Sequence, residues 1–155
     1  MTDRASATLP SPLHTLTSAA WLLLEAELDR LEGVVRRMAE APARDADDDT
    51  DGATIVHLPE AQAVRRLATL RTVAERSAVD DDPDVAVIGR RVTLRETDGT
   101  ELSYALVLPG DGDPTQGWVS ADSPLGAAVA GRRSGDVVQV SAPAGSWSAT
   151  IVAIA

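Results

Sequence analysis

Residues 17–40 have the sequence TSAAWLLLEAELDRLEGVVRRMAE, whose apolar residues predict a helix that packs along one narrow stripe. The members of the stripe lie three or four residues apart: Trp21, Leu24, Leu28, Leu31, Val35 and Met38. This spacing is typical of the a and d positions of a coiled coil. Thr17 or Ser18 would cap the start of the helix, which would be about 36 Å long.

A second stripe follows an acidic connection. Pro42 ends the first pattern, and residues 43–58 are polar and acidic. Pro59 suits the first turn of a second helix. The stripe of this helix is Ala63, Leu67, Leu70, Ala74 and Ser77. Because each stripe alone would be exposed to water, we expect the helices to bury them against each other. Residues 17–78 would then form an antiparallel coiled-coil hairpin with residues 43–58 as its tip loop.

The second half of the chain has the period of two that is typical of β-strands. Residues 85–94 are expected to form one strand region with a bulge at Gly89, followed by a hairpin turn at residues 98–99. A short helix is expected over residues 124–129. Further strands are expected at residues 102–108, 117–120, 137–140 and 147–154. The fold class is therefore α+β: a helical hairpin followed by an antiparallel β domain with one short helix.

The remaining segments suggest how the parts are connected. Residues 1–16 are rich in Ser, Thr, Pro and Ala, which predicts a flexible leader. Residues 79–84 are acidic and contain a proline, which predicts a linker to a domain over residues 85–155. No apolar run is long enough to span a bilayer and no signal peptide is recognisable, so we expect a cytoplasmic protein without a membrane partner.

Composition excludes several kinds of site. The chain has 24 acidic and 14 basic residues and a formal charge of −10, which disfavours tight sequence-independent binding to duplex nucleic acid and favours a basic partner. We also expect no sequence-specific DNA binding. It has no cysteine and only two histidines, His14 and His57, so thiolate and multi-histidine metal centres are excluded. We therefore expect no intrinsic metal or cofactor.

Two stretches of the chain carry a family signature. Leu16-Thr17, followed by the Leu24–Leu31 part of the stripe, is similar to the opening of the Gre family of bacterial transcription elongation factors. Residues 120–131, SADSPLGAAVAG, resemble the same family's Ser-x-Asn/Asp-Ser-Pro-Ile/Leu-x-x-Ala-x-x-Gly signature. GDVV at residues 135–138 and PAG at residues 143–145 follow at the expected distances.

The resemblance implies an accessory factor that is not itself an enzyme. A C-terminal domain similar to the FKBP fold would bind bacterial RNA polymerase at the rim of its secondary channel, through Asp122, Ser123, Pro124 and Leu125. The hairpin would reach down that channel toward the active site. In cleavage-competent members, acidic residues at the tip help to hold a second Mg²⁺, and the polymerase then hydrolyses the RNA 3′ end. We expect this factor to act as a monomer.

The tip departs from the family pattern. Its acidic residues are Asp45, Asp47, Asp48, Asp49 and Asp51. They replace an Asp-Leu-x-Glu-Asn-like element, and the hairpin is several residues shorter. The cluster could contact Mg²⁺ shared with the polymerase, or it could be a solvated loop. Cleavage stimulation and inhibition both remain open, and we favour non-cleaving modulation. An EF-hand site is rejected because Leu58 stands where a bidentate Glu is required.

Four arginines are expected toward the tip end of the hairpin: Arg36, Arg37, Arg65 and Arg66. They could contact RNA or the polymerase, or they could only offset the neighbouring aspartates. Ser123 could likewise be an ordinary helix N-cap as well as part of a contact surface.

Two other functions compete with this interpretation. The C-terminal domain could be a binding module for a different enzyme or for a polymerase partner outside the channel. A stand-alone enzyme using the aspartate loop is disfavoured, because the loop lacks a general base and a pocket. Prolyl isomerase activity is not expected, since an aromatic-lined pocket would have only three aromatic residues in this half: Tyr104, Trp118 and Trp147.

Overall fold

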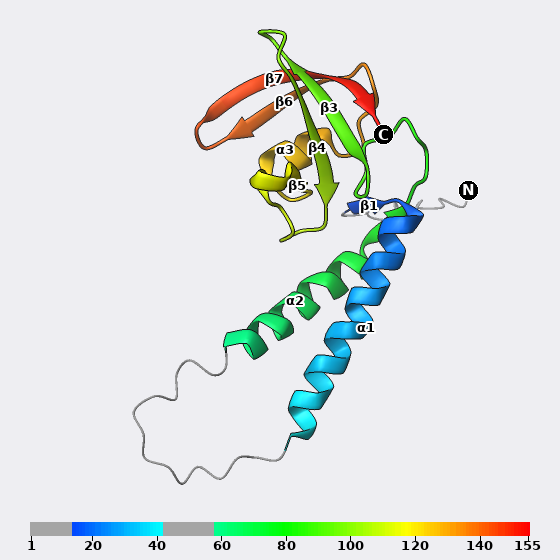
Figure 1. The fold of residues 1–155 in the computed structure, drawn as a ribbon. Coiled ribbons are helices and arrows are strands. Elements are labelled where there is room, and N and C mark those ends of the chain that lie inside the picture. Colours follow the sequence, from blue (N-terminus) through cyan, green and yellow to red (C-terminus); the bar gives the residue numbers. More distant parts are fainter. Residues whose placement is uncertain (1–13, 42–57) are drawn as a thin grey trace, which may run out of the picture.

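The computed structural model describes residues 14–41 and 58–155, which form a pair of helices and a curled β-sheet (Figure 1). Helix α1 spans Ser18–Glu40 and helix α2 spans Leu58–Glu75. They run in opposite directions and extend away from the sheet. The α+β class is confirmed, and so are both predicted helices. The predicted second stripe extends too far, because Ser77 lies beyond the end of α2, in strand β2 (Ser77–Val79). The tip loop up to residue 57 lies outside the described residues.

The predicted stripes hold the helices together. Leu24 and Leu31 of α1 and Leu67 and Leu70 of α2 are all buried, with exposed fractions of 5% or less. Trp21, Leu28 and Val35 pack against this core from its edge. Thr17 caps α1, because its side chain accepts a hydrogen bond from the Ala20 amide.

The predicted flexible leader is wrong for its last three residues. Strand β1 (His14–Leu16) pairs in parallel with strand β2 (Ser77–Val79), so the predicted linker also begins inside a strand. The reason is burial: Leu16 is fully buried, and its carbonyl accepts a hydrogen bond from the Asp80 amide at 2.9 Å. The two ends of the hairpin are thereby joined at its base.

The C-terminal half forms one five-stranded sheet. Its strands are β3 (Arg91–Glu96), β4 (Glu101–Val107), β5 (Trp118–Ser120), β6 (Val137–Ala142) and β7 (Gly145–Ile154). Their spatial order is β5-β4-β3-β7-β6. The prediction of an antiparallel domain is wrong at one edge, because β4 and β5 pair in parallel. A 3-10 turn, η1 (Pro114–Gln116), lies in the connection between them, which is longer than a hairpin turn.

The predicted strand over residues 85–94 is also corrected. Residues 85–88 are buried but form only isolated bridges, such as Leu16 with Ile88, and β3 starts at Arg91. The chain turns at Gly89, whose φ of +99° suits glycine. A Cβ there would lie 2.5 Å from the Thr17 hydroxyl, so the turn brings the two halves of the chain into close contact.

The short helix α3 spans Pro124–Val129, as predicted. It lies beside β5 and below the β6–β7 hairpin in Figure 1. The hairpin turn at residues 98–99 is confirmed by a hydrogen bond from the Glu96 amide to the Thr100 carbonyl. Among the helices of residues 14–41 and 58–155, none combines the length and the apolar composition that a bilayer-spanning helix needs.

Candidate functional site

The turn between β5 and α3 exposes two of the four predicted contact residues. Asp122 and Pro124 are exposed, while Ser123 and Leu125 are half-buried. Ser123 caps α3: its hydroxyl accepts a hydrogen bond from the Gly126 amide at 3.1 Å and donates one to the Ser120 carbonyl at 2.7 Å. The cap thus holds the backbone of the turn, while its neighbours face outward.

Gly126 lets this turn close tightly. A Cβ at Gly126 would lie 2.0 Å from the Ser120 carbonyl oxygen, which is far inside van der Waals contact. The glycine is therefore needed for its small size and not for an unusual backbone angle. The predicted motif has a structural basis in this packing as well as in the Ser123 cap.

The turn is acidic and polar. The Ser120 hydroxyl donates a hydrogen bond to the Asp122 carboxylate. This bond steadies the side chain, although the residue stays exposed. On the other side of β5, the Thr115 hydroxyl and amide both donate to the Asp113 carboxylate and hold the pKa of that carboxyl below its usual range. Two carboxylates therefore flank β5.

An apolar hollow lies next to the exposed turn. Its volume is about 410 Å³, and its lining includes Trp118, Trp147, Leu125 and Val140. Trp118 is 43% exposed. Both tryptophans lie in predicted strands, but local patterns do not predict that they meet, because the contact depends on the order of β5, β6 and β7. We name this feature the Trp118–Trp147 hollow.

Arg66, one of the four arginines expected toward the tip end of the hairpin, contacts the C-terminal half. Its guanidinium donates a hydrogen bond to the Pro109 carbonyl and lies 2.6 Å from the Asp111 carboxylate. It thus connects the middle of α2 to the loop after β4. Arg36, Arg37 and Arg65 are exposed on the helices, and Arg65 lines a shallow hollow that also includes Asp122. No local pattern predicts the Arg66 contact, because the contact depends on how the hairpin meets the sheet.

Acidic residues of the predicted linker fasten the base of the hairpin. Asp81 accepts hydrogen bonds from the hydroxyl and the amide of Ser18, and these bonds lower the pKa of its carboxyl. The Asp84 amide and the Arg133 guanidinium likewise lower the pKa of Asp82, which lies 2.8 Å from Arg133. The linker is therefore bonded to both halves of the molecule.

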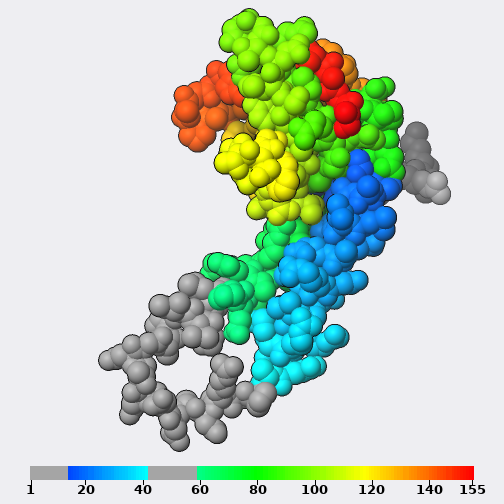
Figure 2. Space-filling model, viewed as in Figure 1, coloured from blue at the N-terminus to red at the C-terminus, as the bar shows by residue number. Residues whose placement is uncertain are grey.

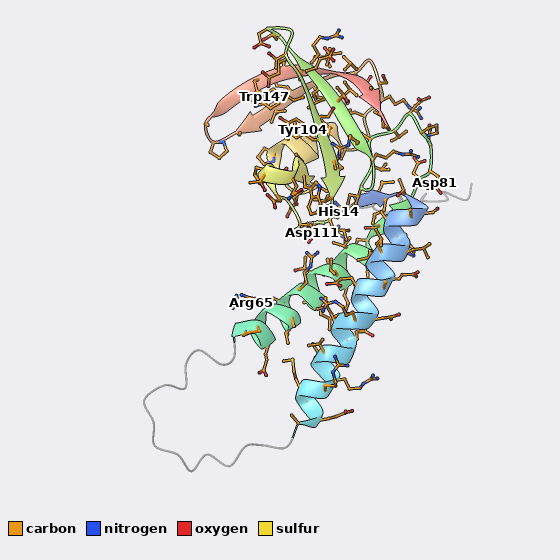
Figure 3. All side chains as sticks on the ribbon, in the orientation of Figure 1. His14, Arg65, Asp81, Tyr104, Asp111 and Trp147 are labelled. Atoms are coloured by element: carbon orange, nitrogen blue, oxygen red, sulfur yellow. The ribbon has the colours of Figure 1, made fainter. Side chains whose placement is uncertain are left out.

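A cavity of about 820 Å³ opens between α2 and the C-terminal half. His14 and Asp122 both contribute to its lining, together with apolar residues such as Val73 and Ile88. Burial lowers the pKa of His14, and the negative charge of Asp122 opposes this shift. Figure 3 labels His14 near the place where the helices meet the sheet.

The five aspartates predicted at the tip lie outside the described residues: Asp45, Asp47, Asp48, Asp49 and Asp51. His57 is outside them as well. Among residues 14–41 and 58–155, no three His, Cys, Asp or Glu side chains are grouped so that they could hold a metal ion.

Comparisons with known proteins show what the chain is similar to. A family profile described as "Transcription elongation factor, GreA/GreB, C-term" matches residues 81–155. "Transcription elongation factor GreA" of Chloroflexus aurantiacus is 34% identical over 149 residues, covering 90% of this chain and 95% of that protein. GreA of Geobacillus kaustophilus is 41% identical over 75 residues, or 48% of each chain. The crystal structure of "GreA factor homolog 1 (Gfh1)" from Thermus thermophilus is 26% identical, with a TM-score of 0.43, and covers 92% of this chain and 98% of that chain.

Proposed function

This chain belongs to the GreA/GreB family of transcription elongation factors, and on that premise we propose that it regulates elongation by binding RNA polymerase at the secondary channel. The observation that carries the proposal is the 34% identity over 90% of the chain to a protein named as such a factor. The C-terminal half would be the anchor, and the helical hairpin would enter the channel. The factor would modulate the activity of the polymerase and would not be an enzyme itself.

The turn at residues 122–125 supports the choice of anchor. Asp122 and Pro124 are exposed, and the Ser123 cap fixes the backbone between them. A preorganised turn loses little conformational freedom on binding, which favours affinity. The negative charge of Asp122 would suit a basic surface of the polymerase. We also propose that the C-terminal half has a fold similar to that of FKBP.

The shape of the hairpin supports the second part of the proposal. Helices α1 and α2 extend away from the sheet (Figure 1), and residues 42–57 lie between them in the sequence. Five aspartates in that connection would bring negative charge toward the catalytic Mg²⁺ of the polymerase. Because the family's tip element is absent, we propose that the factor modulates elongation without stimulating RNA cleavage.

Co-elution with purified bacterial core RNA polymerase tests the anchor. We expect the wild-type chain to co-elute on gel filtration, and Asp122→Asn combined with Pro124→Ala to weaken the association at least tenfold. Pro143→Ala is the matched control, because Pro143 is an exposed proline in the β6–β7 turn. If the wild-type chain fails to bind, the polymerase proposal is wrong, and the alternative of a module for a different enzyme gains support.

A further inference from the structure

The cavity between α2 and the C-terminal half is built from several separate parts of the chain, and we name it the junction cavity. Its volume of about 820 Å³ lies within the range of cavities that hold small organic molecules, about 300–1,000 Å³. Strand β1, helix α2, the end of β4 and helix α3 all contribute to its lining. In Figure 2, the yellow atoms around β5 and α3 lie above the green atoms of α2. A molecule bound in this cavity would therefore touch both halves of the protein.

Most of the lining is apolar. Val73, Ile88 and Leu106 are buried and supply its larger apolar side chains. Small side chains complete the wall: Ala86, Ala121, Ala127 and Ala130. An apolar body that fills the cavity would release water from these walls, which favours binding. No Trp or Tyr is among the described residues of the lining, so a cation there would be recognised by a carboxylate and not by an aromatic face.

The polar groups of the lining are mainly hydrogen-bond acceptors. The hydroxyls of Thr69 and Thr72 already donate to backbone carbonyls one turn earlier in α2, at 3.0 and 3.1 Å, so their remaining capacity is to accept. Burial lowers the pKa of His14, which favours the neutral imidazole with one acceptor nitrogen. The lining therefore suits a ligand group that carries several N–H donors.

The charge of the lining is negative. Asp122 supplies the only carboxylate among the described residues that line the cavity, and no arginine is among them. The carboxylate accepts a hydrogen bond from the Ser120 hydroxyl but forms no ion pair within residues 14–41 and 58–155. Arg65 shares a neighbouring shallow hollow with Asp122 but does not line the junction cavity. The negative charge of Asp122 is therefore available to a ligand.

We infer that the junction cavity binds a small organic amine, whose protonated amino group pairs with Asp122 while its apolar body packs against Val73, Ile88 and Leu106. A protonated primary amine has three N–H donors and one positive charge, which match acceptors gathered around a carboxylate. A small carboxylate or phosphate compound would instead be repelled by Asp122.

The amine site goes beyond the proposed function, and binding of the amine does not depend on it. Asp122 is also a residue of the turn proposed to contact RNA polymerase, so a bound amine would occupy part of that contact. We therefore expect the amine and the polymerase to compete for the chain. This consequence alone rests on the proposed function.

NMR titration of the ¹⁵N-labelled full chain with hexylamine at pH 7 tests the site. We expect the amide signals of Thr72, Ile88 and Ala127 to shift. Hexan-1-ol and hexanoate have the same carbon chain without the positive charge, and both should bind at least tenfold more weakly. Ethylamine lacks most of the apolar body and should also bind more weakly. If hexan-1-ol binds as tightly as hexylamine, or if the shifted signals lie outside the cavity, the inference is wrong.

Variants of the chain test the two halves of the recognition. Asp122→Asn should weaken hexylamine binding at least tenfold. Asp29→Asn, which changes an exposed carboxylate on α1 outside the lining, should leave the affinity within twofold of the wild type. Ala127→Leu should also weaken binding, because a larger side chain at this exposed position of α3 fills the cavity without changing its charge.

Urea unfolding checks that each variant is folded before its affinity is compared. If folded Asp122→Asn binds hexylamine as tightly as Asp29→Asn, the amine is not recognised by Asp122 and the inference is wrong.

Binding of the chain to immobilised bacterial core RNA polymerase separates the site from its consequence. Saturating hexylamine should weaken this binding, while ethylamine at the same concentration, which adds the same charge to the solution, should not. Equal affinity for polymerase with and without hexylamine would overturn the competition. If the chain fails to bind polymerase even without amine, the proposed function is wrong, whereas shifts confined to the cavity in the NMR titration would still establish the amine site.

Discussion

Arg66 of α2 and Asp111 of the loop after β4 form an ion pair of 2.6 Å between the helical hairpin and the C-terminal half. Arg66 also donates a hydrogen bond to the Pro109 carbonyl, so one side chain holds two points of the same loop. The other links lie at the base of the hairpin, where Ser18 bonds to Asp81. Arg66 is therefore placed to set the angle between the hairpin and the sheet.

Removal of Arg66 should loosen that angle. The chain has no cysteine, so spin labels can be attached at Ala39→Cys on α1 and Val137→Cys on β6, both exposed positions. We expect a narrow distance distribution by pulsed electron paramagnetic resonance, and a clearly broader one after Arg66→Ala. Stability should change by only about 1 kcal/mol, because the pair is partly exposed.

Arg65→Ala is the control for this experiment. Arg65 is an exposed neighbour on the same helix and has no ion pair within the described residues. If Arg66→Ala and Arg65→Ala give equal distance distributions, the Arg66–Asp111 pair does not set the angle between the hairpin and the sheet.

Two glycine substitutions should have opposite effects on stability. Gly126→Ala places a methyl group 2.0 Å from the Ser120 carbonyl oxygen, so we expect a loss of about 3 kcal/mol. In Gly33→Ala the new methyl group lies 3.4 Å from the end of the flexible Arg37 side chain, inside a helix. There we expect a gain of about 0.5–1 kcal/mol, because alanine favours helix. Urea unfolding measures both, and a destabilised Gly33→Ala or an unchanged Gly126→Ala would contradict the packing described.

The bond between Ser18 and Asp81 should make stability depend on pH. The two hydrogen bonds from Ser18 lower the pKa of the Asp81 carboxyl in the folded chain. Its contribution is therefore fully present above the unfolded pKa of about 3.9 and is lost as the pH falls through the folded value. We expect Asp81→Asn to destabilise the protein at pH 6 and to differ less from wild type at pH 3.

Asp29→Asn serves as the reference for this pH series. Asp29 is an exposed carboxylate on α1 without a hydrogen bond or ion pair in the described part of the chain. Its small effect should be nearly the same at both pH values. If the free energy of unfolding differs between wild type and Asp81→Asn by the same amount at pH 6 and at pH 3, the role assigned to Ser18 is ruled out.

Local patterns in the sequence predicted much of the fold. The stripe from Trp21 to Met38 marks α1, because apolar periodicity reports directly which face of a helix is buried. The Ser123-Pro124 pair marks the start of α3, because capping depends on neighbouring residues only. Gly99 marks the β3–β4 turn for the same reason.

Features that depend on distant segments could not be predicted in this way. Strand β1 is short and resembles a leader in composition, but its partner Ser77–Val79 lies more than 60 residues later. The parallel pairing of β4 with β5 and the contact of Arg66 with Asp111 also depend on the path of the whole chain. The Trp118–Trp147 hollow forms only when β5 and β7 belong to one sheet.

The tip aspartates should matter for regulation and not for cleavage. We expect that replacing Asp47, Asp48, Asp49 and Asp51 with Ala leaves binding to core polymerase within about threefold of wild type, because the anchor lies in the C-terminal half. The effect of this variant on elongation should be weaker than that of the wild type, because the negative charge near the catalytic Mg²⁺ is lost. Loss of binding in this variant would place the anchor in the hairpin instead.

Transcription by a stalled, backtracked complex of bacterial RNA polymerase with Mg²⁺ tests the proposed function most directly. With the wild-type chain added, we predict that the RNA stays uncleaved and that the rate of restart after nucleotide addition changes. Asp122→Asn combined with Pro124→Ala should abolish this change in the restart rate. Release of short 3′ RNA fragments that disappears when the tip aspartates become Ala would contradict non-cleaving modulation. An unchanged restart rate at saturating protein would contradict regulation of elongation altogether.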